Sequence, residues 1–244
     1  MFDIVICELK KFKGQWIFLI IGAFLLVNGS SSSLNSDTII NADQLYTWIN
    51  LGVFSYGFLA TVNIMTAIMF IQEFKDNTMS SMVIYRHERW KIFVGKIMAI
   101  ILVSLILYIL EFIMLTIFSY LSFKDTLTSA VIIKHLVLTA KAFFFQMLMI
   151  TVTASIALVS KKIIVPLMYI GGQLVISLMY LFNPMLRKVI PFPLPVVSNL
   201  MIIKDDYVFL KDISIIPSAV IIAIIMFIGG LLYGCWYIEK MEIQ

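Results

Sequence analysis

Two ionisable residues stand inside long apolar segments of this sequence. Glu111 follows Lys96 by fifteen residues, which at 1.5 Å per residue places it roughly 22 Å further along a helix. Lys141 lies at a similar height when it is counted back from Lys161. Ionisable side chains at this depth in a membrane pair with one another or face a cavity. The sequence therefore predicts an ion pair between Glu111 and Lys141, with the alternative that each extends separately to the outer interface.

A charged segment, residues 72–96, separates two of the apolar segments. Its charged residues are Glu73, Lys75, Asp76, Arg86, Glu88, Arg89, Lys91 and Lys96. The excess of basic residues predicts a cytoplasmic location, because short inner loops collect Lys and Arg. Asn77 and Thr78 favour the start of a short helix. Met79 and Met82 would share one face of it, and we interpret this helix as an arm that contacts a soluble partner.

The sequence contains no arrangement typical of an enzyme. It has no glycine-rich phosphate loop, and its two histidines, His87 and His135, are too far apart to bind a metal from one helix. We interpret His135 as an interfacial residue rather than a ligand. The serines of residues 30–33 have no His or Lys base near them in sequence. We therefore predict no catalytic residue, no metal site and no cofactor in this chain.

Polar residues inside the apolar segments form a second kind of candidate site. Tyr56, Asn63 and Thr66 mark one side of one segment, and Gln173 lies in another. An amide that faces lipid is costly, so these side chains are candidates for the lining of a substrate path. Packing between helices accounts for the same pattern and is the alternative.

The composition requires a membrane setting. Of the 244 residues, 61% are hydrophobic and 13% are charged, about half the charged fraction of a soluble domain. The predicted fold is an all-α polytopic membrane protein. Its net charge of +4 comes from cations that flank apolar runs, so nucleic acid is not expected as a partner. The six predicted transmembrane helices cover residues 15–34, 47–71, 92–121, 132–160, 163–181 and 213–238.

The distribution of lysines predicts the orientation of these spans. Lys10 and Lys11 precede the first span, whereas residues 14–71 contain no Lys or Arg, which places the amino terminus in the cytoplasm. Lys161 and Lys162 form a short cytoplasmic turn between the fourth and fifth spans. Six spans then return the carboxyl terminus to the cytoplasm.

The first residues, 1–14, are too polar to cross a membrane. Val5 and Leu9 fall on one helical stripe, which is typical of an amphipathic helix lying in the headgroup plane. The alternative is the basic start of a signal peptide, which Asp3 and Glu8 make less favourable.

The segment before the last span, residues 182–212, is predicted to lie outside the cell. Four of the six prolines fall in it, among apolar residues. Backbone at membrane depth is tolerated only where it is buried in protein or lines a cavity. We therefore predict external half-helices that dip into the outer leaflet before span six.

These features together resemble the type-2 permeases of ABC transporters. In that family an acidic residue ends span two, a Gly-Thr and then an Arg follow, and a Gly-Lys opens span three. The matching positions here are Glu73, Thr78, Arg86 or Arg89, and Gly95-Lys96. Asn77 stands where glycine is common, and YRHER replaces a Pro-x-x-Arg stretch. The ELKKFKG lead-in and the insertion before span six also fit, so the resemblance covers nearly the whole chain.

The resemblance implies a multi-pass transport subunit of the plasma membrane without an ATPase site of its own. ATP and Mg²⁺ would be bound by a dimer of separate ATPase subunits that dock on the coupling loop, residues 72–91, and on the amino-terminal helix. A second permease chain, identical or homologous, would face this one. The docking residues that it implies are Glu73, Lys75, Asn77, Thr78, Met79, Met82, Arg86, Arg89, Lys10 and Lys11.

The short length, without a large external domain, resembles permeases of antimicrobial-peptide export and immunity. The expected substrate is then an amphipathic peptide or a lipid-like molecule. Two other classes stay open: the substrate-binding membrane subunit of a vitamin-type importer, and an intramembrane enzyme that modifies lipid. A tightly bound vitamin would favour the importer, and the lack of a His, Asp and Glu cluster disfavours the enzyme.

Overall fold

The computed structural model describes residues 2–13, 39, 41–75, 89–179, 190–201 and 214–240. Every regular element in these ranges is a helix, which confirms the all-α fold. The elements are α1 (Phe2–Lys13), α3 (Ala42–Ile49), the π-helix η1 (Asn50–Gly57), α4 (Phe58–Lys75), α6 (Arg89–Ser122), α7 (Ser129–Ser160), α8 (Ile164–Met179), α9 (Leu194–Leu200) and α10 (Pro217–Lys240).

Helices occupy five of the six predicted spans, and the first, residues 15–34, lies outside the described residues. Within the described part of the chain, four helices are long and apolar enough to cross a membrane. They are Ala42–Lys75, which joins α3, η1 and α4, together with Arg89–Ser122, Ser129–Ser160 and Pro217–Lys240. Helix α8 has 16 residues and is apolar but shorter than these. The number of spans and their orientation therefore stay predictions.

Capping side chains set the ends of two of these helices. The second predicted span begins at Ala42 rather than near residue 47, because Asn41 Oδ1 accepts a hydrogen bond from Gln44 N at 2.9 Å. Thr128 caps α7 in the same way. At the other end of α7, Lys161 adopts a left-handed conformation with φ 53°, which stops the helix and reverses the chain into α8.

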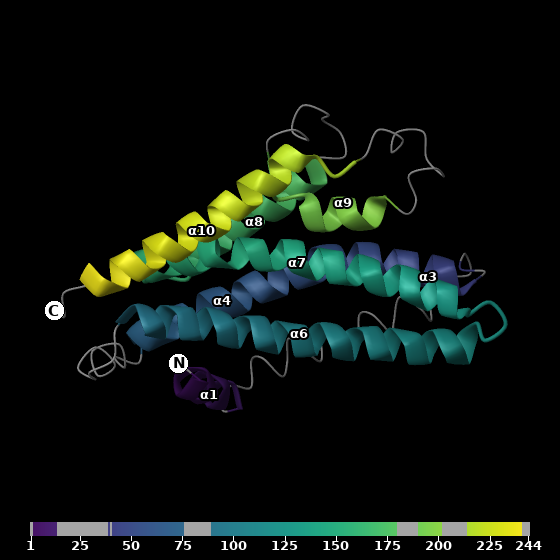
Figure 1. Cartoon of the computed structure of the whole chain (residues 1–244), viewed down its shortest axis with the longest axis horizontal. Helices are drawn as coiled ribbons and strands as arrows, with labels where there is room; N and C mark the ends of the chain where they lie inside the picture. The colour runs from purple at the N-terminus through teal and green to yellow at the C-terminus, as the bar shows by residue number, and fades with distance from the viewer. Residues whose placement is uncertain are drawn as a thin grey trace.

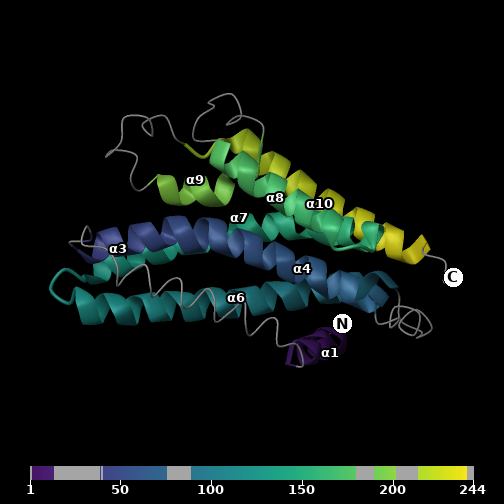
Figure 2. The same cartoon turned by 180° about the vertical axis from the view of Figure 1, so that it is seen from behind.

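Helix α7 is the central element of the bundle, and it packs against α4, α6, α8, α9 and α10. Figures 1 and 2 show α6 running along α7, with α8 and α10 together crossing on the opposite side. Helix α1 lies against α6 near the end of the molecule where α4 and α10 finish. The interior is aromatic and aliphatic, with Tyr46, Phe54, Phe58, Phe70 and Phe93 fully buried.

The outer surface of the bundle is apolar over much of its length. Large side chains such as Ile106 on α6, Met168 on α8 and Ile225 on α10 are each more than half exposed. A surface of this kind is solvated by lipid.

Helix α9 falls within the insertion where half-helices were predicted. It begins after Pro193, and Pro195 stands in its first turn, where a missing N–H costs nothing. All seven of its residues are buried, against α7 and η1. The helix thus meets the requirement that irregular backbone be buried in protein, and residues 180–189 and 202–213 lie outside the described residues.

Candidate functional site

Four charged side chains from three helices meet at the end of the bundle where α4 finishes. Glu8 and Lys11 come from α1, Glu73 from α4 and Lys96 from α6, and we call them the ion cluster. Lys96 Nζ lies 2.9 Å from Glu8 Oε2 and also pairs with Glu73. Lys11 Nζ lies 2.7 Å from Glu8 Oε1 and 2.8 Å from Glu73 Oε1. Each lysine therefore bridges the same two carboxylates.

The packing of α1 on α6 brings the ion cluster together. A Cβ atom on Gly95 would stand 2.6 Å from Ile4 Cγ2, closer than two carbon atoms can approach, so glycine allows the two helices to touch at this point. Glu8 and Lys11 are three residues apart and share a face of α1. The ammonium group of Lys96 lies over the Phe70 ring, with Nζ 5.7 Å from the ring centroid.

The ion cluster is balanced and mostly withdrawn from solvent. Lys96 is completely buried, Glu8 is 1% exposed and Glu73 is 5% exposed. Burial opposes the charge on Lys11, but the nearby Glu73 and Glu8 carboxylates outweigh it, so the pKa of Lys11 is raised above its ordinary value. Such a cluster contributes little net stability, because desolvation offsets the attraction, yet breaking one partner is costly. Its effect is to hold three helices in one arrangement.

The predicted docking residues are distributed between the ion cluster and the surface. Glu73 and Lys11 belong to the ion cluster, whereas Lys75 and Lys10 are exposed. Arg89 donates from Nη1 to the backbone oxygen of Glu239 at 3.3 Å, which connects the start of α6 to the end of α10. The remaining predicted docking residues, Asn77, Thr78, Met79, Met82 and Arg86, lie outside the described residues.

Sequence reasoning did not identify Glu8 and Lys96 as partners. In the sequence, Glu8 stands in the ELKKFKG lead-in and Lys96 in the Gly95-Lys96 motif, and 88 residues separate them. The one local signal is the spacing of Glu8 and Lys11, which favours an ion pair along α1. Val5, on the apolar stripe of α1, is packed against protein and only 8% exposed. The position of α1 in the headgroup plane stays a prediction.

The structure does not bring Glu111 and Lys141 together. Glu111 is 2% exposed, and its Oε2 atom has no hydrogen-bond partner among the described residues. Lys141 is exposed, while its neighbour Ala142 is fully buried. Successive residues are about 100° apart around a helix, so Lys141 points away from the interior that Ala142 faces.

The path candidates lie inside the bundle. Asn63 and Gln173 are each 1% exposed, and Asn63 Nδ2 lies 3.4 Å from Gln173 Oε1. Thr153 Oγ1 donates to Asn63 Oδ1 at 2.5 Å, so α4, α7 and α8 are joined by polar contacts. Thr66 bonds to the carbonyl of Val62 in its own helix. These contacts are the kind expected of packing between helices. A substrate path along these residues stays a prediction.

Tyr56, the fourth path candidate, is half-buried and packs against the apolar residues of α9. It lies in η1, the π-helix, whose wide turn exposes backbone carbonyls to other helices. Gln146 Nε2 of α7 donates to the Phe54 carbonyl at 2.7 Å. Tyr108 of α6 bonds to the side chain of Gln146. Sequence analysis missed this contact between three helices, because a π-helix has no distinct sequence pattern.

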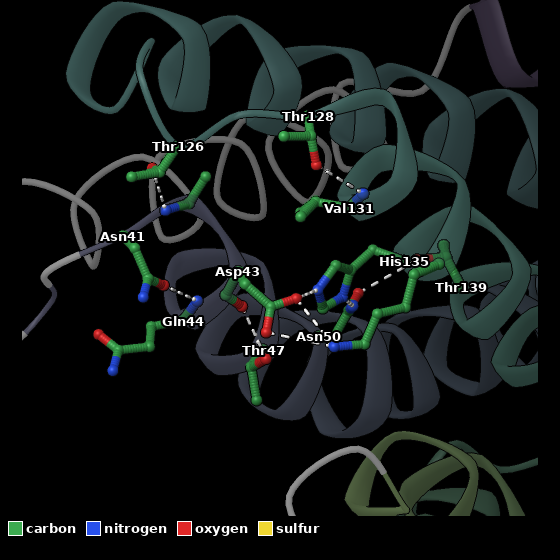
Figure 3. A network of polar contacts seen from close by, with 12 residues as sticks. Asn41, Asp43, Gln44, Thr47, Asn50, Thr126, Thr128, Val131, His135 and Thr139 are labelled. Carbon is green, nitrogen blue, oxygen red and sulfur yellow. Dashed lines mark hydrogen bonds and ion pairs between the residues drawn. The ribbon is translucent and has the colours of Figure 1, made fainter.

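A second polar network joins α3 and the start of η1 to the first third of α7. Figure 3 shows Asp43, Asn50, His135 and Thr139 converging between α3, η1 and α7. Asp43 Oδ1 lies 2.9 Å from His135 Nε2, and Asn50 Nδ2 lies 2.8 Å from His135 Nδ1. Since Asn50 donates to Nδ1, the proton of a neutral imidazole sits on Nε2 and is donated to Asp43. His135 is fully buried, and both of its ring nitrogens are hydrogen-bonded. The sequence predicted an interfacial residue and did not predict these partners.

The π-helix also holds α9 in place. Asn199 of α9 donates from Nδ2 to Ser55 Oγ at 2.8 Å and to the Asn50 carbonyl at 3.2 Å. Ser55 Oγ donates in turn to the Asn50 carbonyl at 2.9 Å. The Asn50 carbonyl therefore accepts hydrogen bonds from two side chains, and one of them attaches α9 to η1.

Replacing Asn199 with Leu is expected to loosen α9. Two donated hydrogen bonds are lost and Ser55 loses a buried partner, which costs about 1–3 kcal/mol. In a chain whose Cys7 and Cys235 are replaced by Ser, a cysteine at Val197, which is 2% exposed, should then react faster with a water-soluble maleimide. Ser198→Ala is the matched control, because within the described residues the Ser198 hydroxyl bonds to the Pro195 carbonyl of the same helix. Equal labelling rates in all three proteins would contradict this role of Asn199.

Comparison with known proteins identifies a family. The model of a family described as "ABC-2 family transporter protein" matches residues 4–184, which is more than half of the chain. The matched range contains every residue of the ion cluster and all of α4, α6, α7 and α8. No curated protein and no solved structure matches the chain significantly.

Proposed function

This chain belongs to the ABC-2 family of transporter membrane proteins, and on that premise we propose that it is the permease subunit of an ATP-driven exporter. The chain is a multi-pass membrane protein, and members of its family lack an ATPase domain of their own and work with an ATPase subunit. The proposed cargo is an amphipathic peptide or a lipid-like molecule that leaves the cell or the membrane. Antimicrobial-peptide export or immunity is the biological setting that we propose.

The ion cluster is the observation that most directly supports transport driven by a separate ATPase subunit. Residues 76–88 connect α4 to α6, and Glu73 and Lys96 lie close to the two ends of this connection. Helix α1 is attached to both of these residues through Glu8 and Lys11. A force applied by an ATPase at the connection would therefore move α1, α4 and α6 together as a rigid body rather than bend one of them.

The membrane-facing surface supports an amphipathic cargo. The outward faces of α6, α8 and α10 carry few charges and many large apolar side chains. A second permease chain, identical or homologous, would face this one and complete a path between them. A vitamin-type importer subunit remains the second candidate, and it predicts a tightly bound vitamin in the purified chain.

Charge reversal at Arg86 and Arg89 tests the proposal. Docking through a basic patch is weakened when its sign changes, so Arg86→Glu with Arg89→Glu should reduce co-purification with the ATPase subunit in mild detergent by about tenfold or more. Lys124→Glu, at an exposed lysine of the turn between α6 and α7, is the control and should leave the association unchanged. Undiminished association in the double variant, or transport by the isolated chain without any ATPase, would contradict the proposal.

A further inference from the structure

A groove of about 580 Å³ opens on the side of the bundle between α7, α8 and α10. This volume falls within the range of small-molecule sites. Its lining includes Val152, Ser155 and Ser160 of α7, Val165 of α8, and Gly229 and Tyr233 of α10. Along α7 it extends from Val152 to Ser160, about 12 Å at 1.5 Å per residue, close to the hydrocarbon depth of one leaflet.

The serine hydroxyls in the wall of this groove are already engaged. Ser155 Oγ donates to the carbonyl of Gly230 at 2.6 Å, and Ser160 Oγ donates to the carbonyl of Lys162 at 3.1 Å. Gly230 packs directly on the α7 backbone, since a Cβ there would stand 2.9 Å from Thr151 C. At Gly229, in contrast, a Cβ would meet nothing within 4 Å. The groove therefore offers its occupant an apolar wall with open space beside Gly229.

The surroundings of the groove are apolar as well. Ile164 is 64% exposed and Met168 is 72% exposed on the neighbouring face of α8. Water would not wet such a surface favourably, whereas hydrocarbon chains would cover it.

One end of the groove is strongly basic. Ser160 lines the groove, and the exposed Lys161 and Lys162 follow it directly in the turn to α8. Lys161 Nζ lies over the Phe74 ring at 5.5 Å, and in the described part of the chain no carboxylate pairs with either lysine. Tyr233 lines the groove and Trp236 is half-exposed one turn further along α10, as aromatic residues at a headgroup boundary are. An apolar slot with a cationic end complements an anionic amphiphile.

We propose that this groove binds an acyl chain of an anionic phospholipid whose phosphate contacts Lys161 and Lys162. The lysine end is the one that the positive-inside rule assigns to the cytoplasm, where the membrane surface is negative. The lipid fills the space between α7 and α10 beside Gly229 and completes the packing of the two helices.

Lipid retention by the purified full-length chain tests this site. The protein is reconstituted into nanodiscs with equal amounts of phosphatidylglycerol and phosphatidylcholine, transferred to detergent, and its bound lipids are counted by native mass spectrometry. The wild-type chain retains phosphatidylglycerol preferentially. Attraction to an anionic headgroup contributes about a fivefold preference for each lysine, so Lys161→Gln with Lys162→Gln should bring the ratio of the two lipids close to one. Lys124→Gln, at an exposed lysine of the opposite turn, should leave the ratio unchanged.

A second variant tests the slot independently of charge. Gly229→Leu places a side chain in the open space and should reduce retention of both lipids severalfold. Gly171→Leu is its control, because a Cβ at Gly171 also meets nothing within 4 Å but lies outside the groove. Unchanged retention in both the lysine and the Gly229 variants would overturn the proposal. A shift from dimer to monomer in Gly229→Leu with lipid retention intact would overturn it as well, and would identify the groove as an interface between copies of the chain.

Discussion

Replacing Lys96 by methionine is expected to destabilise the permease by about 3–5 kcal/mol. Among the residues that the structure describes, the substitution leaves Lys11 as the cation shared by the buried Glu8 and Glu73, and Lys11 is the more exposed of the two lysines. Methionine fills nearly the same volume beside Phe70, so the loss comes from the unpaired charge rather than from a cavity. The measurement is the midpoint of thermal unfolding of the purified chain in detergent.

Two further variants separate the ion cluster from a general effect of removing a lysine. Lys75→Met changes an exposed side chain two residues after Glu73 and should change the free energy of unfolding by no more than about 0.5 kcal/mol. Glu8→Gln combined with Lys96→Met restores the charge balance, and this double variant should be more stable than Lys96→Met alone. If the two substitutions add without interaction, the four residues do not act as one cluster.

Replacing Gly95 by leucine is expected to separate α1 from α6. The new side chain would occupy the position of Ile4, whose Cγ2 atom is 2.6 Å from the site of a Cβ. Overpacking of this kind costs about 1–3 kcal/mol, and a cost of 1–2 kcal/mol raises the population of the open state about 5- to 30-fold. Trypsin should therefore cleave after Lys10 and Lys11 faster by a factor in this range, as followed by release of an amino-terminal tag.

The matched control for this prediction is Gly171→Leu, at a glycine that has open space around it. Cleavage in that variant should proceed at the wild-type rate. If both variants are cleaved alike, or if Gly95→Leu is as resistant as the wild type, α1 is not held by its contact with Gly95. Substrate should also stimulate the ATPase less in Gly95→Leu than in the wild type, because α1 is proposed to move with α4 and α6 when the ATPase subunit acts on them.

Much of the fold could be predicted from local features of the sequence. Long apolar runs set the helices, and Asn41 and Thr128 set two of their starts through capping. Lys161 and Lys162 were identified as a tight turn, which the structure has between α7 and α8. These features depend on neighbouring residues, so a single sequence carries enough information.

The candidate site depends on contacts that neighbouring residues do not determine. The pairing of Glu111 with Lys141 was predicted from the rise per residue alone, which does not determine the direction of a side chain, because an error of one residue in a helix boundary turns it by about 100°. The ion cluster joins Glu8 to Lys96 across a segment that includes the first predicted span, and the packing of α1 on α6, close at Gly95, brings the two residues together. Lys96 was predicted to be one of the cations that orient the chain in the membrane, whereas in the structure it is buried and paired with two carboxylates.

The wide turn at η1 sets the relative rotation of the two ends of the second predicted span. Helices α3 and α4 belong to one continuous rod, yet each residue added to or removed from the turn between them rotates one end against the other by about 100°. Asp43 and Glu73 therefore reach their partners on α7 and α6 only with η1 at its present length. Side chains can vary along this rod. An insertion or deletion within residues 50–57, however, would turn either Asp43 away from α7 or Glu73 away from α6.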